Sequence, residues 1–356
     1  MSAETDFLVD RTDLRRTTFA PARADALTAG RVRVRIDRFA FTANNITYGA
    51  VGDMIGYWRF FPADGSWGRI PVWGFGDVVE SRHDAIHSGE RIYGYFPMST
   101  HVTLQPEHVS VASFVDASAH RAGLPPIYNN YTRVAADPAY DPGHEAEIVL
   151  FRPLFTTAFL LDDFFGAHDL FGARTAVLTS ASSKTALGLA FLLATRIPVV
   201  GLTARRNAGF VRGTGYYATT LPYEEIETLS DDTSAVLVDF AGNGELLARV
   251  HRRLGEALRY SSRVGVTHWD RMTAPDALPG PAPVFFFAPD RARERVAEWG
   301  PQVFQTRVAD ATRRFLSSTG QWLRVVEGRG PDAVAAIYRA TLDGHTDPAE
   351  GHVLSL

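Results

Sequence analysis

The chain of 356 residues has a net charge of −4 and contains no cysteine, which excludes disulfide bonds and thiolate metal sites. Its Lys and Arg residues are scattered, so no nucleic-acid partner is expected. No apolar run approaches the ~18 residues of a membrane span, and the first residues, MSAETDFLVDRTDLRR, lack the apolar stretch of a secretory signal. We therefore expect a cytoplasmic protein.

The first part of the chain is predicted to be rich in β-strands. Val32 to Ile36 alternates apolar and polar residues, as a half-buried strand does. Short aromatic and β-branched runs follow, RIPVWGFGDVVES and SGERIYGYFPMSTHVTL, and this spacing indicates a small barrel or sandwich. From about Asp116 to Pro142 we expect an irregular connection, because prolines interrupt the chain there.

From about Phe155 the pattern changes to alternating helices and strands. TTAFLLDDFFGAHDLFG is predicted to be a helix, and the strand AVLTS, the helix TALGLAFLLATR and the strand PVVGLTA follow it. Further strands are expected at SAVLVDFAG, SSRVGVTHW and PVFFFA. Because these strands are apolar throughout, they indicate a parallel sheet covered by helices on both faces.

This layout resembles the medium-chain dehydrogenase/reductase superfamily, in its zinc-free quinone oxidoreductase and enoyl reductase branch. IPVWGFGDVVES with HSGERIYGYF, and VLVDFAGN with VGVTH, carry the resemblance. It implies an α/β protein with two domains: a chaperonin-10-like β-barrel domain (1–154 and 315–356) for the substrate and catalysis, and a Rossmann doubly wound parallel sheet domain (155–314) that binds the nucleotide. It also implies NAD(P)-dependent oxidoreduction. Within this superfamily, LFRPLFTTAFLLDDFF, SASSKTALGLA and DPAEGHVLSL resemble a family known only as a domain of unknown function.

The turn after the strand at 176–179 lacks the glycines of a dinucleotide fingerprint. In their place stand Ser180, Ser182, Ser183, Lys184 and Thr185. Hydroxyl groups and a lysine at a helix N-terminus can bind phosphate, because the free N–H groups and the helix dipole already favour an anion there. We expect a phosphate-binding turn. The alternative is that a serine merely caps the helix and the turn binds nothing.

The second strand of the expected Rossmann domain ends with Thr203, Arg205 and Arg206. About 20 residues beyond the turn, a carboxylate would bind the ribose of NAD, but this segment has none. An arginine there can receive the 2′-phosphate of NADP, so the sequence predicts NADP(H) as the cofactor. The resemblance adds Gly242 and Thr267, at two later strand ends that flank the nicotinamide.

Two segments rich in tyrosine and asparagine are candidates for the catalytic groups. FTANNITYGAVGDMIGYW contains Asn45, Tyr48 and Tyr57, and IYNNYTRV contains Tyr128 and Tyr131. A phenol can donate a proton or hold an enolate oxygen, and an amide can hold a carbonyl. The alternative is structural: the asparagines form a turn, the aromatic side chains are core residues, and IYNNYTRV is a surface loop.

No metal is predicted. In the resembled superfamily the zinc-binding histidine position falls on Phe75 in this chain, and His83 and His87 lie in a short connection between two expected strands.

We therefore predict an NADPH-dependent, zinc-independent reductase of an activated C=C or C=O bond in a small, largely apolar substrate. One alternative is a protein with an altered cofactor that uses its tyrosines for proton-transfer chemistry, as a lyase, an isomerase or a retro-aldol enzyme. Another is a sensor that binds NADPH without turnover. The resemblance, together with the apolar strand in PVFFFAP, predicts a homodimer paired along the edges of the Rossmann sheets.

Overall fold

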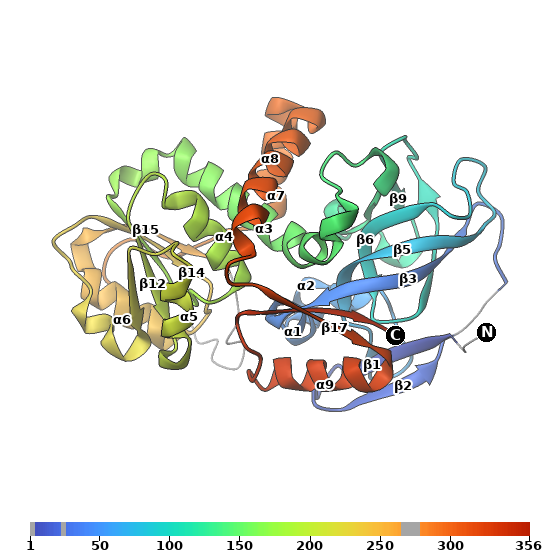
Figure 1. Ribbon diagram of the computed structural model, residues 1–356, viewed down its shortest axis with the longest axis horizontal. Helices are drawn as coiled ribbons and strands as arrows, with labels where there is room; N and C mark the ends of the chain where they lie inside the picture. Colours follow the sequence, from blue (N-terminus) through green and yellow to red (C-terminus); the bar gives the residue numbers. More distant parts are fainter. Residues whose placement is uncertain (1–3, 23–25, 265–277) are drawn as a thin grey trace. The chain divides into compact units, whose positions relative to one another are not determined.

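The computed structural model describes residues 4–22, 26–264 and 278–356. The chain forms two compact units (Figure 1), unit 1 with Met1–Leu150 and Val325–Leu356 and unit 2 with Phe151–Arg324. The assignment of the two domains to substrate and nucleotide stays a prediction. Among the described residues, no helix has both the length and the apolar character that crossing a bilayer requires.

Antiparallel sheet dominates unit 1. Its strands are β1 (Thr5–Asp10), β2 (Thr17–Pro21), β3 (Val32–Phe41), β4 (Trp67–Gly68), β5 (Pro71–Ser81), β6 (Arg91–Pro97), β7 (His101–Leu104), β8 (Pro106–Glu107), β9 (Ser113–Asp116), β10 (Asn130–Arg133), β17 (Arg324–Arg329, which begins at the boundary) and β18 (Glu350–Ser355). Its helices are α1 (Ala43–Ala50), α2 (Gly52–Ile55) and α9 (Gly330–Leu342), with short 3-10 helices η1 (Tyr57–Arg59), η2 (Ala119–Arg121) and η3 (Pro126–Tyr128).

Strand β3 organises this sheet. One edge of β3 pairs with β5, and the other pairs with β7 and β18, all antiparallel. Within the described residues the sheet continues from β5 through β6, β10 and β9 to β8, while β2, β1 and β4 form a smaller sheet. Val32, Val34 and Ile36 point into the core, as their alternation predicts, and the strand runs on to Phe41.

Unit 2 is built on a parallel sheet. Its strands are β11 (Thr175–Leu178), β12 (Val199–Thr203), β13 (Thr219–Pro222), β14 (Ala235–Asp239), β15 (Leu258–Arg263) and β16 (Val284–Phe285). Its helices are α3 (Glu145–Ala167, which begins in unit 1), α4 (Lys184–Leu193), α5 (Ala208–Gly213), α6 (Gly244–Leu254), α7 (Ala288–Trp299) and α8 (Pro301–Thr319). Two of its short 3-10 helices are η7 (Arg205–Asn207) and η8 (Tyr223–Thr228).

The order of the described strands in this sheet is β13-β12-β11-β14-β15-β16, and all the pairs are parallel. This is the doubly wound Rossmann order, so the predicted fold class is confirmed. All five residues of β14 are buried, which requires cover on both faces of the sheet because successive side chains alternate. Helix α6 covers one face with Leu246, Leu247 and Val250, and it lies beside the sheet in Figure 1.

Two expectations for local structure were wrong. The connection from Asp116 to Pro142 contains strand β10, which pairs with β6 and β9, and the prolines beside it obscured this strand in the sequence. Helix α3 begins at Glu145, well before the predicted start, and it contains Pro153. The hydroxyl groups of Thr156 and Thr157 bond to the carbonyls of Arg152 and Pro153, which satisfies carbonyl oxygens around that proline.

Three strands and a helix of unit 1 meet at one arginine. The Arg91 guanidinium lies 2.8 Å from Asp37 on β3, 2.8 Å from Asp77 on β5 and 2.7 Å from Glu145 at the start of α3. Its side chain is 23% exposed, so solvent screens these charge-assisted bonds only in part. Arg91 therefore fixes where α3 leaves the sheet.

We predict that Arg91→Met lowers the free energy of unfolding by about 2 kcal/mol, because it leaves three carboxylates without their common partner. The matched control is Arg35→Met, since Arg35 is 56% exposed and bonds to Asp77 as well. The control should change stability by less than about 0.5 kcal/mol. Urea denaturation followed by circular dichroism measures both, and equal losses would contradict the role given to Arg91.

Candidate functional site

Four tyrosines from four different elements of unit 1 pack together. We call Tyr48, Tyr57, Tyr95 and Tyr128 the tyrosine cluster. Ring centroids lie 4.5 Å apart for Tyr48 and Tyr57, 4.9 Å for Tyr95 and Tyr128, and 5.8 Å for Tyr57 and Tyr128. Phe60 and Trp73 complete the cluster, each packing against Tyr95. Helix α1, the 3-10 helices η1 and η3, and strand β6 thus bring their phenols to one place.

The phenols of the cluster are neutral at physiological pH. Burial raises the pKa of Tyr48 and Tyr57, and it raises the pKa of Tyr95 and Tyr128 well above the usual value. The hydroxyl oxygens of Tyr57 and Tyr128 lie 3.2 Å apart, and either can donate to the other. Groups of this kind are suited to donate a hydrogen bond or a proton, and unsuited to act as phenolate bases.

Two buried donors of the cluster lie beside the Tyr48 hydroxyl. The hydroxyl of Tyr95 and the indole N–H of Trp73 have no partner in good hydrogen-bond geometry within the part of the chain that the structure describes, although both lie close enough to the Tyr48 hydroxyl to interact with it. Tyr95 is fully buried, and an unsatisfied buried polar group costs about 1–3 kcal/mol. Residues 73 and 95 face each other directly across β5 and β6. A ligand oxygen between these donors would recover that free energy.

Two glycines position Tyr57. The indole ring of Trp58 lies so close to Gly52 and Gly68 that a Cβ atom would sit 2.3 Å from it at Gly52 and 2.4 Å at Gly68. No other residue fits at either position without displacing the ring. Trp58 is 4% exposed, so it anchors η1 in the core and fixes Tyr57 beside it.

A buried ion pair positions Tyr128. Arg121 and Asp116 are each about 1% exposed and lie 2.9 Å apart. The Arg121 guanidinium also donates to the carbonyl of Tyr128 and to the hydroxyl of Tyr131, and it stacks on Phe61. Buried pairs are stable only with such additional hydrogen bonds. This pair therefore holds the segment from β9 to η3 against the cluster.

Of the five predicted catalytic residues, the structure brings Tyr48, Tyr57 and Tyr128 together and leaves two elsewhere. Asn45 accepts a hydrogen bond from the Thr42 N–H and donates one to the Pro71 carbonyl, so its amide caps α1. The Tyr131 hydroxyl donates to the Tyr95 carbonyl inside the core, and Tyr131 is fully buried. We withdraw Asn45 and Tyr131 as catalytic candidates, because their polar groups hold the fold.

Sequence reasoning missed Tyr95 and Trp73. Trp73, Tyr93 and Tyr95 occupy alternating positions on the neighbouring strands β5 and β6, and alternation puts such residues on one face of a sheet. That pattern was the available signal. It was hidden by the glycines that stand between these residues.

In unit 2, the turn from Ser180 to Thr185 joins β11 to α4. Ser180 has φ 49°, the left-handed conformation for which the fingerprint uses glycine. Its N–H donates to the hydroxyl of Tyr223, and the Tyr217 hydroxyl donates to the carbonyl of Ala181. Burial raises the pKa of Tyr223 to about 12 and the pKa of Tyr217 well above its usual range. Both tyrosines therefore remain neutral and hold the turn by hydrogen bonds. Neither tyrosine was predicted.

Close packing of this turn depends on a glycine of the neighbouring strand. A Cβ atom on Gly201 of β12 would lie 2.9 Å from the Cβ of Ala181 and 2.7 Å from the ring of Tyr217. Ser182 ties the same two elements together, because its hydroxyl oxygen accepts hydrogen bonds from Thr203 and Asn207. In the dinucleotide fingerprint, glycines in the turn leave room for close packing. In this chain, Gly201 on the neighbouring strand β12 leaves that room.

The N-terminus of α4 offers donors to an anion. The Ser183 hydroxyl caps the helix by accepting from the Ala186 N–H, whereas the N–H groups of Ser182 and Thr185 have no partner among the described residues. Lys184 is the first residue of the helix. Two N–H groups, a lysine and the helix dipole are the donor set that phosphate takes, so these residues fit a dinucleotide phosphate. Ser183 therefore caps α4, and the N–H groups of Ser182 and Thr185 remain available to an anion.

The end of β12 was expected to carry only positive charge, but two carboxylates lie beside one of its arginines. Arg205 lies 3.1 Å from Glu225 and 3.7 Å from Glu224, both on η8. Sequence spacing showed no carboxylate near this strand end, because these two come from the following β-α connection. Thr203 is buried and bonds to Ser182, while Arg205 and Arg206 are exposed. The site therefore combines two arginines with two acids.

The end of β14 carries a buried carboxyl group. Asp239 is 1% exposed, and one of its oxygens accepts hydrogen bonds from the Thr179 hydroxyl and from the N–H groups of Ala241 and Gly242. Burial raises the pKa of Asp239. Gly242 has φ 67°, so it makes the left-handed turn after the strand. Thr267, the other residue predicted beside the nicotinamide, lies outside the described residues.

In the described residues, no three His, Asp or Glu side chains are placed to hold a metal ion. Phe75 is fully buried and packs against Tyr93.

The neutral state of the cluster leads to a pH prediction. Folded Tyr48, Tyr57, Tyr95 and Tyr128 should keep their protons when exposed tyrosines ionise near their usual pKa of 10.0. Stability should be independent of these groups below about pH 10 and fall above it, because the unfolded chain releases protons that the folded chain retains. Phenolate absorbance and circular dichroism followed together test this. Full ionisation near pH 10 in a folded protein would contradict it.

The packing of the turn leads to a second prediction. Gly201→Ala should lower the free energy of unfolding by about 1–3 kcal/mol, because the new methyl group overlaps Ala181 and Tyr217. Gly209→Ala, on α5 with nothing within 4 Å of the added Cβ, should leave stability unchanged or raise it by up to about 1 kcal/mol. Thermal or urea unfolding compares the two. Equal effects would show that the turn and β12 are not tightly packed.

The fold is similar to that of several solved structures. CurA from Vibrio vulnificus, solved in complex with NADPH, is 12% identical, with a TM-score of 0.63 over 99% of this chain and 98% of its own. The yhdH oxidoreductase from Salmonella enterica, in complex with NADP, is 14% identical, with a TM-score of 0.54 over 99% of both chains. The mitochondrial 2-enoyl thioester reductase Etr1p/Etr2p heterodimer from Candida tropicalis is 10% identical, with a TM-score of 0.59 over 100% of both.

At these identities the likeness concerns the fold alone, and it confirms the fold that the sequence resemblance implied. No curated protein matches the sequence. The predicted membership of a family without known activity is also confirmed. The model of the family described as "Protein of unknown function (DUF2855)" matches residues 39–347, and the chain belongs to this family.

Proposed function

We propose that the protein is an NADPH-dependent, zinc-independent reductase of an activated C=C or C=O bond in a small, largely apolar substrate. The observation that carries the proposal is the turn from Ser180 to Thr185, which keeps two unpaired N–H donors and a lysine at the N-terminus of α4. The solved structures of similar fold named above include one with NADPH and one with NADP.

In this proposal each part of unit 2 has a separate task. The N–H groups of Ser182 and Thr185, with Lys184, hold the pyrophosphate. Arg206 and Arg205 receive the 2′-phosphate, although Glu224 and Glu225 compete for Arg205. Four uncharged residues set the shape of the site and add no charge to it: Ser180, Ser183, Thr203 and Gly242. Bound NADPH supplies the hydride.

The tyrosine cluster of unit 1 supplies the groups for the substrate. The hydroxyl of Tyr95 and the indole N–H of Trp73, which have no partner in good hydrogen-bond geometry, hold a carbonyl oxygen and stabilise the negative charge that hydride addition puts on it. The hydrogen-bonded pair of Tyr57 and Tyr128 delivers the proton, since both phenols are neutral. The aromatic rings around these groups suit an apolar substrate and exclude water.

We also propose a cytoplasmic homodimer. The absence of cysteine fits a reducing compartment. Among the described strands of the Rossmann sheet β16 lies at the edge, and its Val284 and Phe285 are 47% and 61% exposed. Pairing of two such edges would cover these side chains.

Cofactor binding tests the proposal first. Calorimetric titration should show NADPH binding more tightly than NADH. Lys184→Ala and the double variant Arg205→Ala/Arg206→Ala should each weaken NADPH binding by about tenfold or more. Glu224→Gln/Glu225→Gln should tighten it, because Arg205 loses its competing acids. Arg252→Ala, an exposed arginine on α6, is the matched control and should change nothing. If neither nucleotide binds at millimolar concentration, the cofactor assignment is wrong.

Turnover tests the phenols. With an enone that the wild-type protein reduces, Tyr57→Phe and Tyr128→Phe should each lower kcat by about 10²-fold, because proton delivery is lost, while NADPH affinity stays the same. Tyr338→Phe is the control, since this buried tyrosine bonds to Leu14 in the main core of unit 1. Unchanged kcat in both cluster variants would show that the proton comes from elsewhere. Binding of NADPH without oxidation of any carbonyl compound would favour a sensor.

A further inference from the structure

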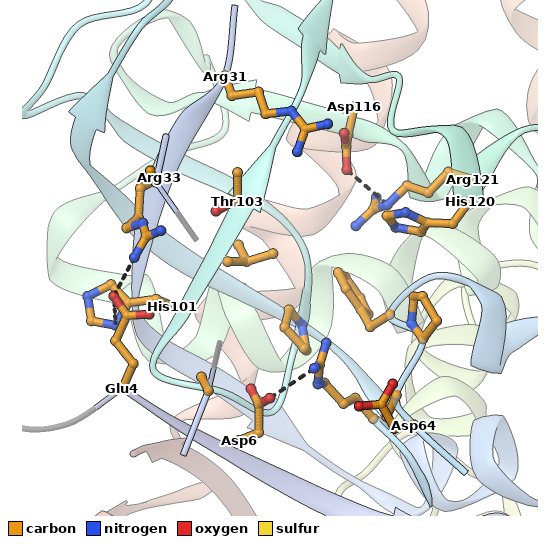
Figure 2. A pocket seen from close by; sticks show the side chains of 18 residues that line it. Glu4, Asp6, Arg31, Arg33, Asp64, His101, Thr103, Asp116, His120 and Arg121 are labelled. Carbon is orange, nitrogen blue, oxygen red and sulfur yellow. Dashed lines mark hydrogen bonds and ion pairs between the residues drawn. The ribbon is translucent and has the colours of Figure 1, made fainter. Parts of the chain in front are cut away.

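Unit 1 contains a pocket of about 310 Å³ that the proposed reduction does not use. Figure 2 shows it between strands β1, β3 and β7 and the segments that carry Asp64, Asp116 and Arg121. Its volume is at the lower end of the range of pockets for small molecules. Most of the side chains labelled in Figure 2 are charged, so a ligand of this pocket has to form favourable electrostatic interactions with them.

Three ion pairs line this pocket, and within each pair the arginine and the carboxylate neutralise each other. Arg33 lies 2.8 Å from Glu4, Arg69 lies 2.9 Å from Asp6, and Arg121 lies 2.9 Å from Asp116. Each pair is at least largely buried, with exposed side-chain fractions of 26% or less. Breaking a pair to bind a ligand would be costly. The ligand therefore has to be bound by the remaining charges.

The remaining charges are Arg31 and Asp64. Both line the pocket, and neither side chain forms a hydrogen bond or an ion pair with the residues that the structure describes. Figure 2 shows them on opposite sides of the pocket, with the Arg31 guanidinium on the side of Asp116 and Arg121 and the Asp64 carboxylate on the side of Asp6. The pocket is thus neutral as a whole and dipolar across its width.

Neutral and apolar groups also line the pocket. His120 also lines the pocket, and partial burial with the neighbouring Arg121 and Arg31 lowers its pKa. Its Nε2 lies 3.1 Å from the Phe60 carbonyl. Phe61, Pro62 and Val102 supply apolar surface. A ligand with charged ends and an aliphatic middle matches this arrangement.

The geometry points to a binding site for a small zwitterion, an amino acid or ω-amino acid, whose carboxylate pairs with Arg31 and whose ammonium group pairs with Asp64. A simple anion would leave Asp64 unpaired, and a simple cation would leave Arg31 unpaired. Only a ligand with both charges satisfies both residues. The pocket is a site separate from the tyrosine cluster, although Arg121 borders both.

Three sets of probes test this inference with the full chain, without any nucleotide. Calorimetric titration compares zwitterions of increasing length (glycine, β-alanine, γ-aminobutyrate and ε-aminocaproate) with carboxylates and amines of matched length (butyrate, caproate, butylamine and hexylamine). We expect at least one zwitterion to bind about tenfold or more tightly than its matched carboxylate and amine, because it forms both ion pairs. The inference is overturned when no zwitterion exceeds its matched probes.

Substitutions locate the site. Arg31→Gln and Asp64→Asn should each weaken binding of the preferred zwitterion by about tenfold, and both should fold normally, because these exposed side chains form no hydrogen bond or ion pair within the described residues. Arg329→Gln, at a side chain of unit 1 that is 78% exposed and outside the pocket, is the control and should bind as the wild type does. Unchanged affinity in both pocket variants would also overturn the inference. None of these outcomes depends on whether the protein reduces a carbonyl compound.

Discussion

The chain has to turn sharply after strand β11, and most of the candidate nucleotide site follows from how it does so. A left-handed residue is needed at Ser180, and a serine takes that conformation at a cost that glycine would avoid. Tyr223 and Tyr217 stabilise the strained turn with hydrogen bonds, and Gly201 leaves the room it needs. The arrangement explains how a turn without glycine can keep the N–H groups of Ser182 and Thr185 open to an anion.

In unit 1, the burial of polar groups determines the properties of the candidate substrate site. The tyrosine cluster gathers phenols whose pKa values burial raises, so they can donate but not accept protons at physiological pH. Holding them together requires rigid support. Trp58, locked between two glycines, supports Tyr57, and the pair of Arg121 and Asp116 supports Tyr128. Such support keeps the two hydroxyls within hydrogen-bond distance.

The fold was more predictable than the site. The apolar strands and their spacing gave the Rossmann sheet, because a strand buried on both faces leaves a continuous apolar run, as in β14. Strand β10 and the start of α3 were missed because prolines stand inside or beside them. Proline weakens a local pattern, whereas pairing with β6 and β9 is a property of the folded chain.

The sequence indicated some of the side chains that lie together in the candidate site, but not those that other strands and connections bring to it. Tyr48, Tyr57 and Tyr128 lie together, but the equally suggestive Asn45 and Tyr131 have their polar groups bound within the fold. Tyr95, Trp73, Tyr217, Tyr223 and the two acids beside Arg205 come from other strands and connections. Spacing along the sequence cannot reveal such contacts.

The most direct test of the account is the effect of NADPH on the backbone amide resonances of the turn. In a titration followed by nuclear magnetic resonance, the amides of Ser182 and Thr185 should shift most and towards lower field, because each N–H gains a phosphate oxygen. Pyrophosphate alone should shift the same two signals in the same direction. If both amides stay unchanged while NADPH is bound elsewhere, or if no signal of the turn responds at all, then the turn only joins a strand to a helix.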